Sequence, residues 1–327
     1  MDQHVDRAQV DANVLLQHGR WSGGRAKSMY GAKGESLGPA THYYRKSSGA
    51  DVVVGHPAMK GRAEISLERI SEDRFRIDYR QQAPLKIFLP RIDLGTAAEV
   101  VLANSAGGIA GGDHLTVRVA MGADTAAVVT SQAAEKAYRS RGPAADLETR
   151  VTVGPRARLA WVPQETILFD GARLCRRLEF DLDGTACLLA GEMWVFGRIA
   201  RGEVFGRGLL HDVWRIRQNG RLVWADNLRL DGDIRRPLDA TAGFAGARAA
   251  AVLMLAGPDA AGLLEPVRRI IDRAPCRAGA TVVGEVLVAR WLGPDPAEVR
   301  AGYGECAAVL MQQAEPARSG LPVVWNV

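Results

Sequence analysis

The sequence predicts a mainly β fold, an extensive mixed and antiparallel-rich β structure with a few helices, mostly in the C-terminal third. Three observations carry this prediction. Between about residue 63 and residue 230, apolar and polar residues alternate in many short segments, and this is the periodicity of strands with one buried face. Turn-forming residues separate these segments at short intervals. After about residue 237, two segments instead repeat their apolar residues at helical spacing.

The chain divides into two parts by composition. Residues 1–60 are rich in Gly, Ser, Lys and Arg and show little periodicity, so they are predicted to form a disordered N-terminal extension. Residues 61–327 are predicted to form one β-rich domain. Its strand-helix-strand-helix portion, from about residue 238, is expected to pack on the β core because no long linker separates the two.

The β part contains a series of predicted strands. They cover residues 65–67, 75–79, 99–104, 115–121, 125–130, 147–153, 157–161, 174–182 and 185–190. The clearest hairpin spans residues 212–224, where Asn219 and Gly220 readily take the positive φ angles of a type I′ turn. Asp183 and Gly184 are expected to turn the chain from one strand into the next. If that turn closes a hairpin, Cys175 and Cys187 face each other; otherwise they are packed core thiols.

The C-terminal part is predicted to alternate between strands and helices. Residues 249–255 form an apolar strand, and residues 260–273 have helical spacing, with Pro266 marking a kink or a later helix start. Residues 281–291 are predicted to be one strand. A second helix is expected over residues 295–313, opened by Pro296 in its first turn.

Bulk composition excludes several classes of protein. Hydrophobic residues make up 47% of the chain and charged residues 24%, as in ordinary globular proteins. The net charge of +5 favours either an acidic partner surface or solubility, and the dispersed arginines do not indicate a nucleic-acid module. No apolar run reaches membrane-spanning length. The four cysteines are far apart and lack zinc spacing, so we expect free thiols in a reducing cytoplasm.

A glycine-rich turn precedes the strand at residues 115–121. Gly107, Gly108, Gly111 and Gly112 do not match the dinucleotide fingerprint, and Asp113 stands where a phosphate-binding loop needs lysine. The periodicity after the loop is that of a strand, so no helix N-terminus is offered to an anion. We therefore interpret the glycines as residues that permit unusual backbone angles at a tight crossing, and predict no nucleotide site.

Two candidate sites flank the predicted strands at residues 115–121 and 125–130. Asp113 either contributes to metal binding or acid–base chemistry, or it is a turn residue that accepts hydrogen bonds from backbone N–H groups. Thr130 and Ser131 end a predicted strand. One of them is expected to cap a short helix over residues 132–138, with Glu135 as a capping-box partner.

Glu165 and Glu192 also lie at predicted strand ends, beside turn residues. The two carboxylates fit a glycosidase pair, a polar passage for a cation, or solvated turns without a function. Motifs for activated nucleophiles and for histidine metal cages are missing. The residues alone leave these alternatives open.

Three sequence blocks resemble one family. GGIAGGD followed by TSQAAEKAYRS within residues 104–140, WVPQETILFDGA at residues 161–172 and GEMWVFGRIARGEVF at residues 191–205 resemble, in the same order, the urease accessory protein UreD, also called UreH. The resemblance extends from about residue 63 to the C-terminus and is strongest over residues 104–230. The N-terminal extension lies outside it.

The resemblance implies a non-enzymatic protein of the cytoplasm. Such proteins, with UreF and the GTPase UreG, engage apo-urease and help to deliver nickel to its active site; their C-terminal region meets UreF. The resemblance implies that nickel is bound only transiently, that no cofactor is held tightly, and that neither nucleic acid nor a membrane is a partner.

The resemblance also implies a route for nickel, a water-filled passage through the protein. Block positions place five residues along or near it: Asp113, Glu165 and Glu192 as exchangeable ligands, and Thr130 and Ser131 as lining. The alternatives are a carboxylate-dependent hydrolase using Asp113, Glu165 or Glu192, and a β-rich interaction module without a metal role.

Overall fold

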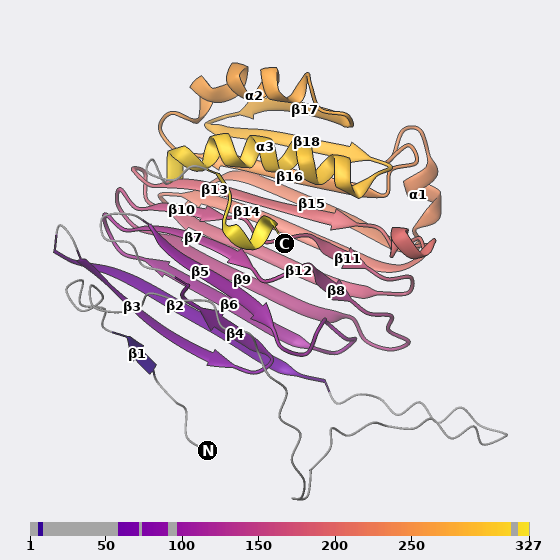
Figure 1. Cartoon of the computed structure of the whole chain (residues 1–327), viewed down its shortest axis with the longest axis horizontal. Coiled ribbons are helices and arrows are strands. Elements are labelled where there is room, and N and C mark those ends of the chain that lie inside the picture. The colour runs from indigo at the N-terminus through magenta and orange to yellow at the C-terminus, as the bar shows by residue number, and fades with distance from the viewer. Residues whose placement is uncertain (1–5, 9–57, 72–73, 91–96, 315–319, 327) are drawn as a thin grey trace, which may run out of the picture. The chain divides into compact units, whose positions relative to one another are not determined.

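The protein is described by a computed structural model that covers residues 6–8, 58–71, 74–90, 97–314 and 320–326. Within these residues, two β-sheets lie face to face and helices cover the outer face of one of them (Figure 1). The N-terminal extension predicted for residues 1–60 lies outside the described residues, apart from a short strand at residues 6–8 and the residues from 58 onward.

The first sheet, sheet A, has eight strands. In spatial order they are β1 (Asp6–Ala8), β3 (Arg74–Gln82), β2 (Lys60–Ser71), β6 (His114–Met121), β9 (Ala145–Val153), β12 (Arg173–Leu182), β14 (Arg207–Gln218) and β15 (Arg221–Asp233).

The second sheet, sheet B, has ten strands. Its main path is β17 (Arg277–Val283), β18 (Val286–Gly293), β16 (Ala249–Ala256), β13 (Cys187–Val195), β10 (Arg158–Trp161), β7 (Ala126–Ser131), β5 (Ala98–Asn104) and β4 (Leu85–Phe88). Two short strands, β11 (Thr166–Leu168) and β8 (Glu135–Ala137), pair with each other, and β11 also pairs with β13.

Parallel pairs form the middle of both sheets, and antiparallel pairs form their margins. The middle is parallel because the chain alternates between the sheets: β6, β9 and β12 in sheet A lead into β7, β10 and β13 in sheet B. Parallel neighbours need a crossover connection, and here a strand of the opposite sheet supplies it. The prediction of a mainly β, mixed fold with few helices is confirmed.

The main apolar core lies between the two sheets. Strand alternation decides which side chains enter it: on β13, Leu188, Ala190 and Trp194 belong to this core, whereas Leu189 and Met193 belong to a second core. Because sheet B is covered on both faces, β13 and β16 are buried almost throughout. We call the side of sheet B that faces sheet A its inner side and the opposite side its outer side.

The second core lies on the outer side of sheet B, beneath the helices. These are α2 (Leu264–Ile271) and α3 (Pro296–Ala314), and α3 lies across β16 (Figure 1). The remaining helical segments are α1 (Arg235–Asp239), η1 (Ile199–Arg201), η2 (Ala260–Leu263) and η3 (Val323–Asn326).

Both predicted helices are confirmed, and Pro266 lies in the first turn of α2, which favours the later start over a kink. Among the described helices, none has the length and apolar character needed to cross a membrane.

Some of the turns and helices predicted from local sequence are confirmed, and others were wrong. The hairpin of β14 and β15 is confirmed, with φ of 50° at Asn219 and 76° at Gly220. The prediction of one strand over residues 281–291 was wrong, because Gly284 (φ 61°) turns the chain between β17 and β18. The short helix over residues 132–138 was also wrong. Ala133 turns the chain with φ of 62°, and the residues beyond it pair with β11 as strand β8.

The turn at Asp183 and Gly184 does not close a hairpin. It leads from β12 in sheet A to β13 in sheet B, so Cys175 and Cys187 lie in different sheets. All four cysteines are free thiols, in agreement with the expectation of unpaired, packed cysteines.

Candidate functional site

Asp113 lies in the turn before β6 and is 2% exposed. Its Oδ1 accepts a hydrogen bond from the backbone N–H of Met59 (2.8 Å), and its Oδ2 accepts one from that of Ala110 (2.8 Å). Both carboxylate oxygens thus stabilise backbone turns, as the turn-residue interpretation expects. The remaining lone pairs of these oxygens are the only part of the group left for another ligand.

The glycine loop before Asp113 is a tight crossing. Gly112 has φ of +88°, which disfavours any residue with a side chain. Gly111 needs glycine for a different reason, since a Cβ there would collide with Ser140 Oγ and lie 2.7 Å from the carbonyl oxygen of Pro143. The loop binds back on the protein: the hydroxyl of Tyr138 donates to the carbonyl oxygen of Gly107 (2.8 Å).

Glu135 lies beside this loop, and its pKa is raised. The amide of Asn104 donates to its two carboxylate oxygens (3.3 and 3.2 Å) and also to the carbonyl oxygen of Gly108 (3.1 Å). Burial raises the pKa of Glu135 from its ordinary value of 4.5 to about 7, against the opposing effect of the Asn104 hydrogen bond. The Asp113 carboxylate contributes to the rise, so the two groups are electrostatically coupled.

Glu192 belongs to a buried charged cluster that joins the two sheets. Arg176 Nη1 on β12 donates to Glu192 Oε2 on β13 (2.7 Å), and Arg176 Nε donates to Asp212 Oδ1 on β14 (2.6 Å). The indole N–H of Trp161 donates to Glu192 (3.2 Å), and that of Trp214 donates to Asp212 (3.0 Å). Each of the three charged side chains is at most 4% exposed. One guanidinium between two carboxylates leaves this cluster with a net charge of −1 when all three groups are ionised.

Burial and pairing act against each other in this cluster. Burial alone would lower the pKa of Arg176, but the carboxylates of Asp212 and Glu192 outweigh burial and raise it. Arg176 is therefore a fixed cation. Burial raises the pKa of Glu192, and the Arg176 charge opposes that rise. Such a cluster is costly to assemble in an apolar core, so it is weak evidence for a role in stability alone.

Polar side chains link this cluster to the glycine loop. Glu135, Thr166 and Trp194 are neighbours in register on β8, β11 and β13, and their strand phase points them to the inner side. Arg176 Nη1 approaches Thr166 Oγ1 at 3.5 Å. A row of polar groups thus crosses the apolar core from the glycine loop to β14. We call this row the polar band: Asn104, Glu135, Thr166, Arg176, Glu192 and Asp212.

Glu165 lies on the outer side of sheet B. Its carboxylate pairs with Arg300 of α3, which also donates to the carbonyl oxygen of Trp325 (3.0 Å) and lies with its Cζ 4.5 Å from the Trp325 ring centroid. Trp325 Nε1 donates to Thr130 Oγ1 (3.1 Å), and Ser131 Oγ accepts from the backbone N–H of Gln164 (2.9 Å). We call this group the outer corner: Thr130, Gln164, Glu165, Arg300 and Trp325.

The five residues expected along a passage are therefore divided. Thr130 and Glu165 meet in the outer corner. Ser131 binds the backbone of Gln164 there, but its strand phase is that of the inner residues Ala127 and Val129. Glu192 lies in the polar band, and Asp113 lies beside the glycine-loop end of that band. Glu165 and Glu192 lie on opposite sides of sheet B. They consequently do not form the carboxylate pair of a glycosidase, which must flank one bond.

Arg176 and Asp212 were not predicted from the sequence, and Glu135 was predicted only as a capping residue. A usable signal was present on β12, where Arg176 occupies the same strand phase as Leu174 and Leu178. An arginine in the apolar phase of a strand indicates a buried partner of opposite charge. The identity of that partner depends on which strands become neighbours, and this is a long-range property.

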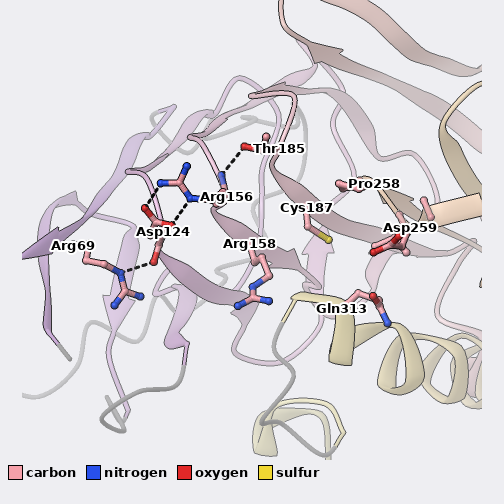
Figure 2. Close-up of a pocket in the computed structure, with 12 residues that line it drawn as sticks. Arg69, Asp124, Arg156, Arg158, Thr185, Cys187, Pro258, Asp259 and Gln313 are labelled. Atoms are coloured by element: carbon pink, nitrogen blue, oxygen red, sulfur yellow. Dashed lines mark hydrogen bonds and ion pairs between the residues drawn. The ribbon is translucent and has the colours of Figure 1, made fainter. Parts of the chain in front are cut away.

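A hollow of about 770 Å³ lies at the turns that join the two sheets (Figure 2). Arg156 binds both carboxylate oxygens of Asp124 (2.7 and 2.6 Å), its backbone N–H donates to Thr185 Oγ1 (2.9 Å), and Arg69 donates to the Asp124 carbonyl oxygen (2.6 Å). Burial raises the pKa of Cys187 in this hollow to about 11, so its thiol is protonated at neutral pH and a poor nucleophile. These contacts hold consecutive turns together and do not indicate catalysis.

No cluster of three or more His, Cys, Asp or Glu side chains within the described residues has the arrangement of a metal site. The oxygen-bearing groups instead follow one another along the polar band. Dispersed carboxylate, hydroxyl and amide oxygens suit a hard or borderline cation that exchanges its ligands.

Comparison with known proteins gives a consistent result. The family model described as UreD urease accessory protein matches residues 59–326. A urease accessory protein UreD of Methylobacterium sp. (strain 4-46) is 47% identical over 228 residues, which cover 68% of this chain and 80% of that protein. The corresponding protein of Magnetococcus marinus is 40% identical over 267 residues, covering 80% of this chain and 91% of that protein. Urease accessory protein UreD 3 of Methylorubrum extorquens is 43% identical over 252 residues.

Proposed function

Since this chain belongs to the UreD family of urease accessory proteins, we propose that it acts in urease maturation as a scaffold and as a conduit for nickel. In this proposal it works with UreF and the GTPase UreG, engages apo-urease and performs no catalysis of its own. The proposal assigns GTP binding to UreG and not to this chain, whose glycine loop leads into a strand and carries Asp113 where a phosphate-binding loop carries lysine. Its four free thiols suit the reducing cytoplasm.

The observation that supports the conduit is the polar band. Arg176, Glu192 and Asp212 are buried in an apolar core. Removing each charge from water costs several kcal/mol before ion pairing offsets the cost. The sum for three ions is on the order of the free energy of unfolding of a whole domain. A packed apolar core would give a two-sheet fold without that cost. A cargo that uses the band would account for a charged cluster built at this cost.

The ligand types suit transient binding. A nickel ion in transit must be released as readily as it is captured, and separate carboxylate oxygens with water hold it less tightly than thiolates or a histidine cage. We assign contact with the ion to Glu135, Glu192 and Asp212 along the band, with Asp113 at its glycine-loop end. Arg176 limits affinity, because its fixed positive charge repels the ion.

The outer corner is a second candidate route. Glu165 and Thr130 would line a path there, with Ser131 beside it, only if the segment carrying Trp325 moved away, because the Trp325 side chain is 7% exposed and donates to Thr130. The C-terminal region is also where the proposal places contact with UreF. The proposal therefore commits to the polar band and leaves the outer corner as the alternative to be tested.

Co-expression of urease with its accessory proteins, with and without this chain, tests the proposal. We expect urease activation to require the chain. Glu192→Gln should lower activation, Glu165→Gln should leave it nearly unchanged, and both variants should still be recovered with UreF. Equal activation with and without the chain would refute the role in maturation. Loss through Glu165→Gln alone would move the route to the outer corner, and normal activation by both variants would favour an interaction module without a metal role.

A further inference from the structure

A second pocket opens between the sheets at the far end of the polar band. It encloses about 450 Å³ and is lined by residues of β14 and β15 from sheet A and of β16 and β18 from sheet B. Asp212 of the band and Trp194 belong to its lining, with Asp226 and Arg290 also contributing. The pocket therefore connects the surface to the buried charged cluster.

Two buried donors near this pocket lack a hydrogen-bond acceptor among the described residues. They are Arg176 Nη2 and Trp194 Nε1. Arg176 Nη2 shares the guanidinium edge of Nε, which binds Asp212, and the Arg176 Cζ lies 5.4 Å from the Trp194 ring centroid. Both donors thus lie beside groups that line the pocket. A buried donor without an acceptor costs about 1–3 kcal/mol, so water reaching these atoms through the pocket is the simplest resolution.

An ion pair spans the pocket between the two sheets. Arg290 on β18 donates to Asp226 on β15, and their side chains are 55% and 28% exposed. Within the described residues Arg290 has no other hydrogen-bond or ion-pair partner, so rotation of this exposed side chain breaks only one pair. Exposed pairs contribute little, about 1 kcal/mol or less, and Arg290 is consequently free to swing away at small cost.

The pocket becomes more negative with that movement, because one of the two cations that face its three carboxylates leaves. With Arg290 in place, Asp226 is neutralised. With Arg290 turned outward, Asp226, Asp212 and Glu192 face the single inner cation Arg176. Arg277 at the rim is occupied by the carbonyl oxygens of Phe244 and Ala245 (3.0 and 3.3 Å). The opened pocket is negative and wet, which suits a hydrated divalent cation better than an anion.

We propose that this pocket is the mouth of the polar band, where a hydrated divalent cation enters, and that Arg290 is its gate, occupying Asp226 until a cation displaces it. The inference rests on the proposed conduit and specifies its entrance and its control. Asp226 is the first carboxylate that the ion meets, and Asp212 is the next.

The test is equilibrium dialysis of the purified full-length chain against Ni²⁺ alone, with bound metal measured by mass spectrometry. Arg290→Gln should tighten nickel binding about fivefold, because it removes one competing charge near the ion. Asp226→Asn should weaken it by about the same factor. Arg229 and Asp231 offer a matched control: they form an exposed ion pair on the same strand β15 (2.6 Å), and Arg229→Gln and Asp231→Asn should leave nickel binding unchanged.

Several outcomes would overturn the gate. Equal affinity of wild type, Arg290→Gln and Asp226→Asn would do so, as would no measurable nickel binding by wild type and Arg290→Gln. Equal changes from the control pair would indicate general surface electrostatics. If Glu192→Gln lowers urease activation while the Arg290 and Asp226 variants bind and activate normally, the conduit stands and its entrance lies elsewhere. If Glu192→Gln has no effect on activation, the conduit itself fails.

Discussion

The inner and outer sides of sheet B carry similar residues in very different settings. On the inner side, Glu192 pairs with Arg176 and both are at most 4% exposed. On the outer side, Glu165 pairs with Arg300, and their side chains are 19% and 24% exposed. The inner pair is shielded from bulk solvent and depends on its partners, whereas the outer pair keeps more of its hydration. Both glutamates were predicted at strand ends, but Glu192 lies inside β13 and only Glu165 lies at a strand end, just before β11. The two should therefore respond differently to the same substitution.

The largest contrast is expected at Arg176. Arg176→Met leaves Glu192 and Asp212 buried without a cation and should destabilise the fold by about 3–5 kcal/mol. Arg177 follows it on β12, is exposed and faces the other way, so Arg177→Met should change stability by no more than about 0.5 kcal/mol. Urea denaturation of both variants makes the comparison. Similar stabilities for the two would show that the inner cluster is not the desolvated charge network described above.

The next largest effect concerns the segment that covers the outer corner. Trp325 stacks on Tyr303 with ring centroids 5.6 Å apart and donates to Thr130, so Trp325→Ala should cost about 3 kcal/mol. Val323 in the same segment is 73% exposed, and Val323→Ala should be nearly neutral. Thermal and urea unfolding provide the measurement. A neutral Trp325→Ala would mean that the segment does not hold the outer corner closed.

An intermediate effect is expected from pH at Glu135. Its folded-state pKa of about 7 exceeds the ordinary value of 4.5, so the folded protein binds the proton more tightly than the unfolded chain. The resulting stability is complete below pH 4.5 and is lost as pH rises through 7, by about 3 kcal/mol at most. Glu135→Gln should remove this decline between pH 5 and 8, whereas Glu148→Gln on β9 should retain it. An unchanged pH profile in Glu135→Gln would contradict the assigned pKa.

The smallest effect should come from Glu165. Its pair with Arg300 is partly hydrated, and Glu165→Gln should cost about 1 kcal/mol or less. A double-mutant cycle with Arg300→Met isolates the pair from the other contacts of Arg300. A coupling energy as large as that between Glu192 and Arg176 would erase the distinction between the two sides of the sheet.

Local structure was largely predictable from sequence. The type I′ turn at Asn219 and Gly220 needs only residues with access to positive φ, and the structure has them there. The failures arose where a distant strand overrode a local signal. The helix predicted for residues 132–138 is replaced by strand β8 because Glu135 pairs with Thr166 of β11. Within residues 281–291, continuous apolar character hid the turn at Gly284.

The sequence predicted several residues of the candidate site, but it did not predict which of them lie together in the folded chain. Sequence blocks singled out Glu165 and Glu192, yet the side of the sheet that each faces follows from strand phase and from which sheet each strand joins. Arg176 and Asp212 become partners only because β12 and β14 are parallel neighbours in register. No local pattern encodes that pairing, because the whole of β13 lies between them along the chain.

The most direct test of the central claim is the nickel content of urease matured with a band variant at limiting nickel. Glu192→Gln removes a carboxylate of the band while keeping its shape. Glu179→Gln is the control, since Glu179 lies on β12, faces outward and approaches Arg215 (3.6 Å). Nickel per urease active site should fall with Glu192→Gln, recover partly with added nickel, and stay normal with Glu179→Gln, at equal recovery with UreF. Full nickel loading with Glu192→Gln at limiting nickel would contradict transport along the polar band.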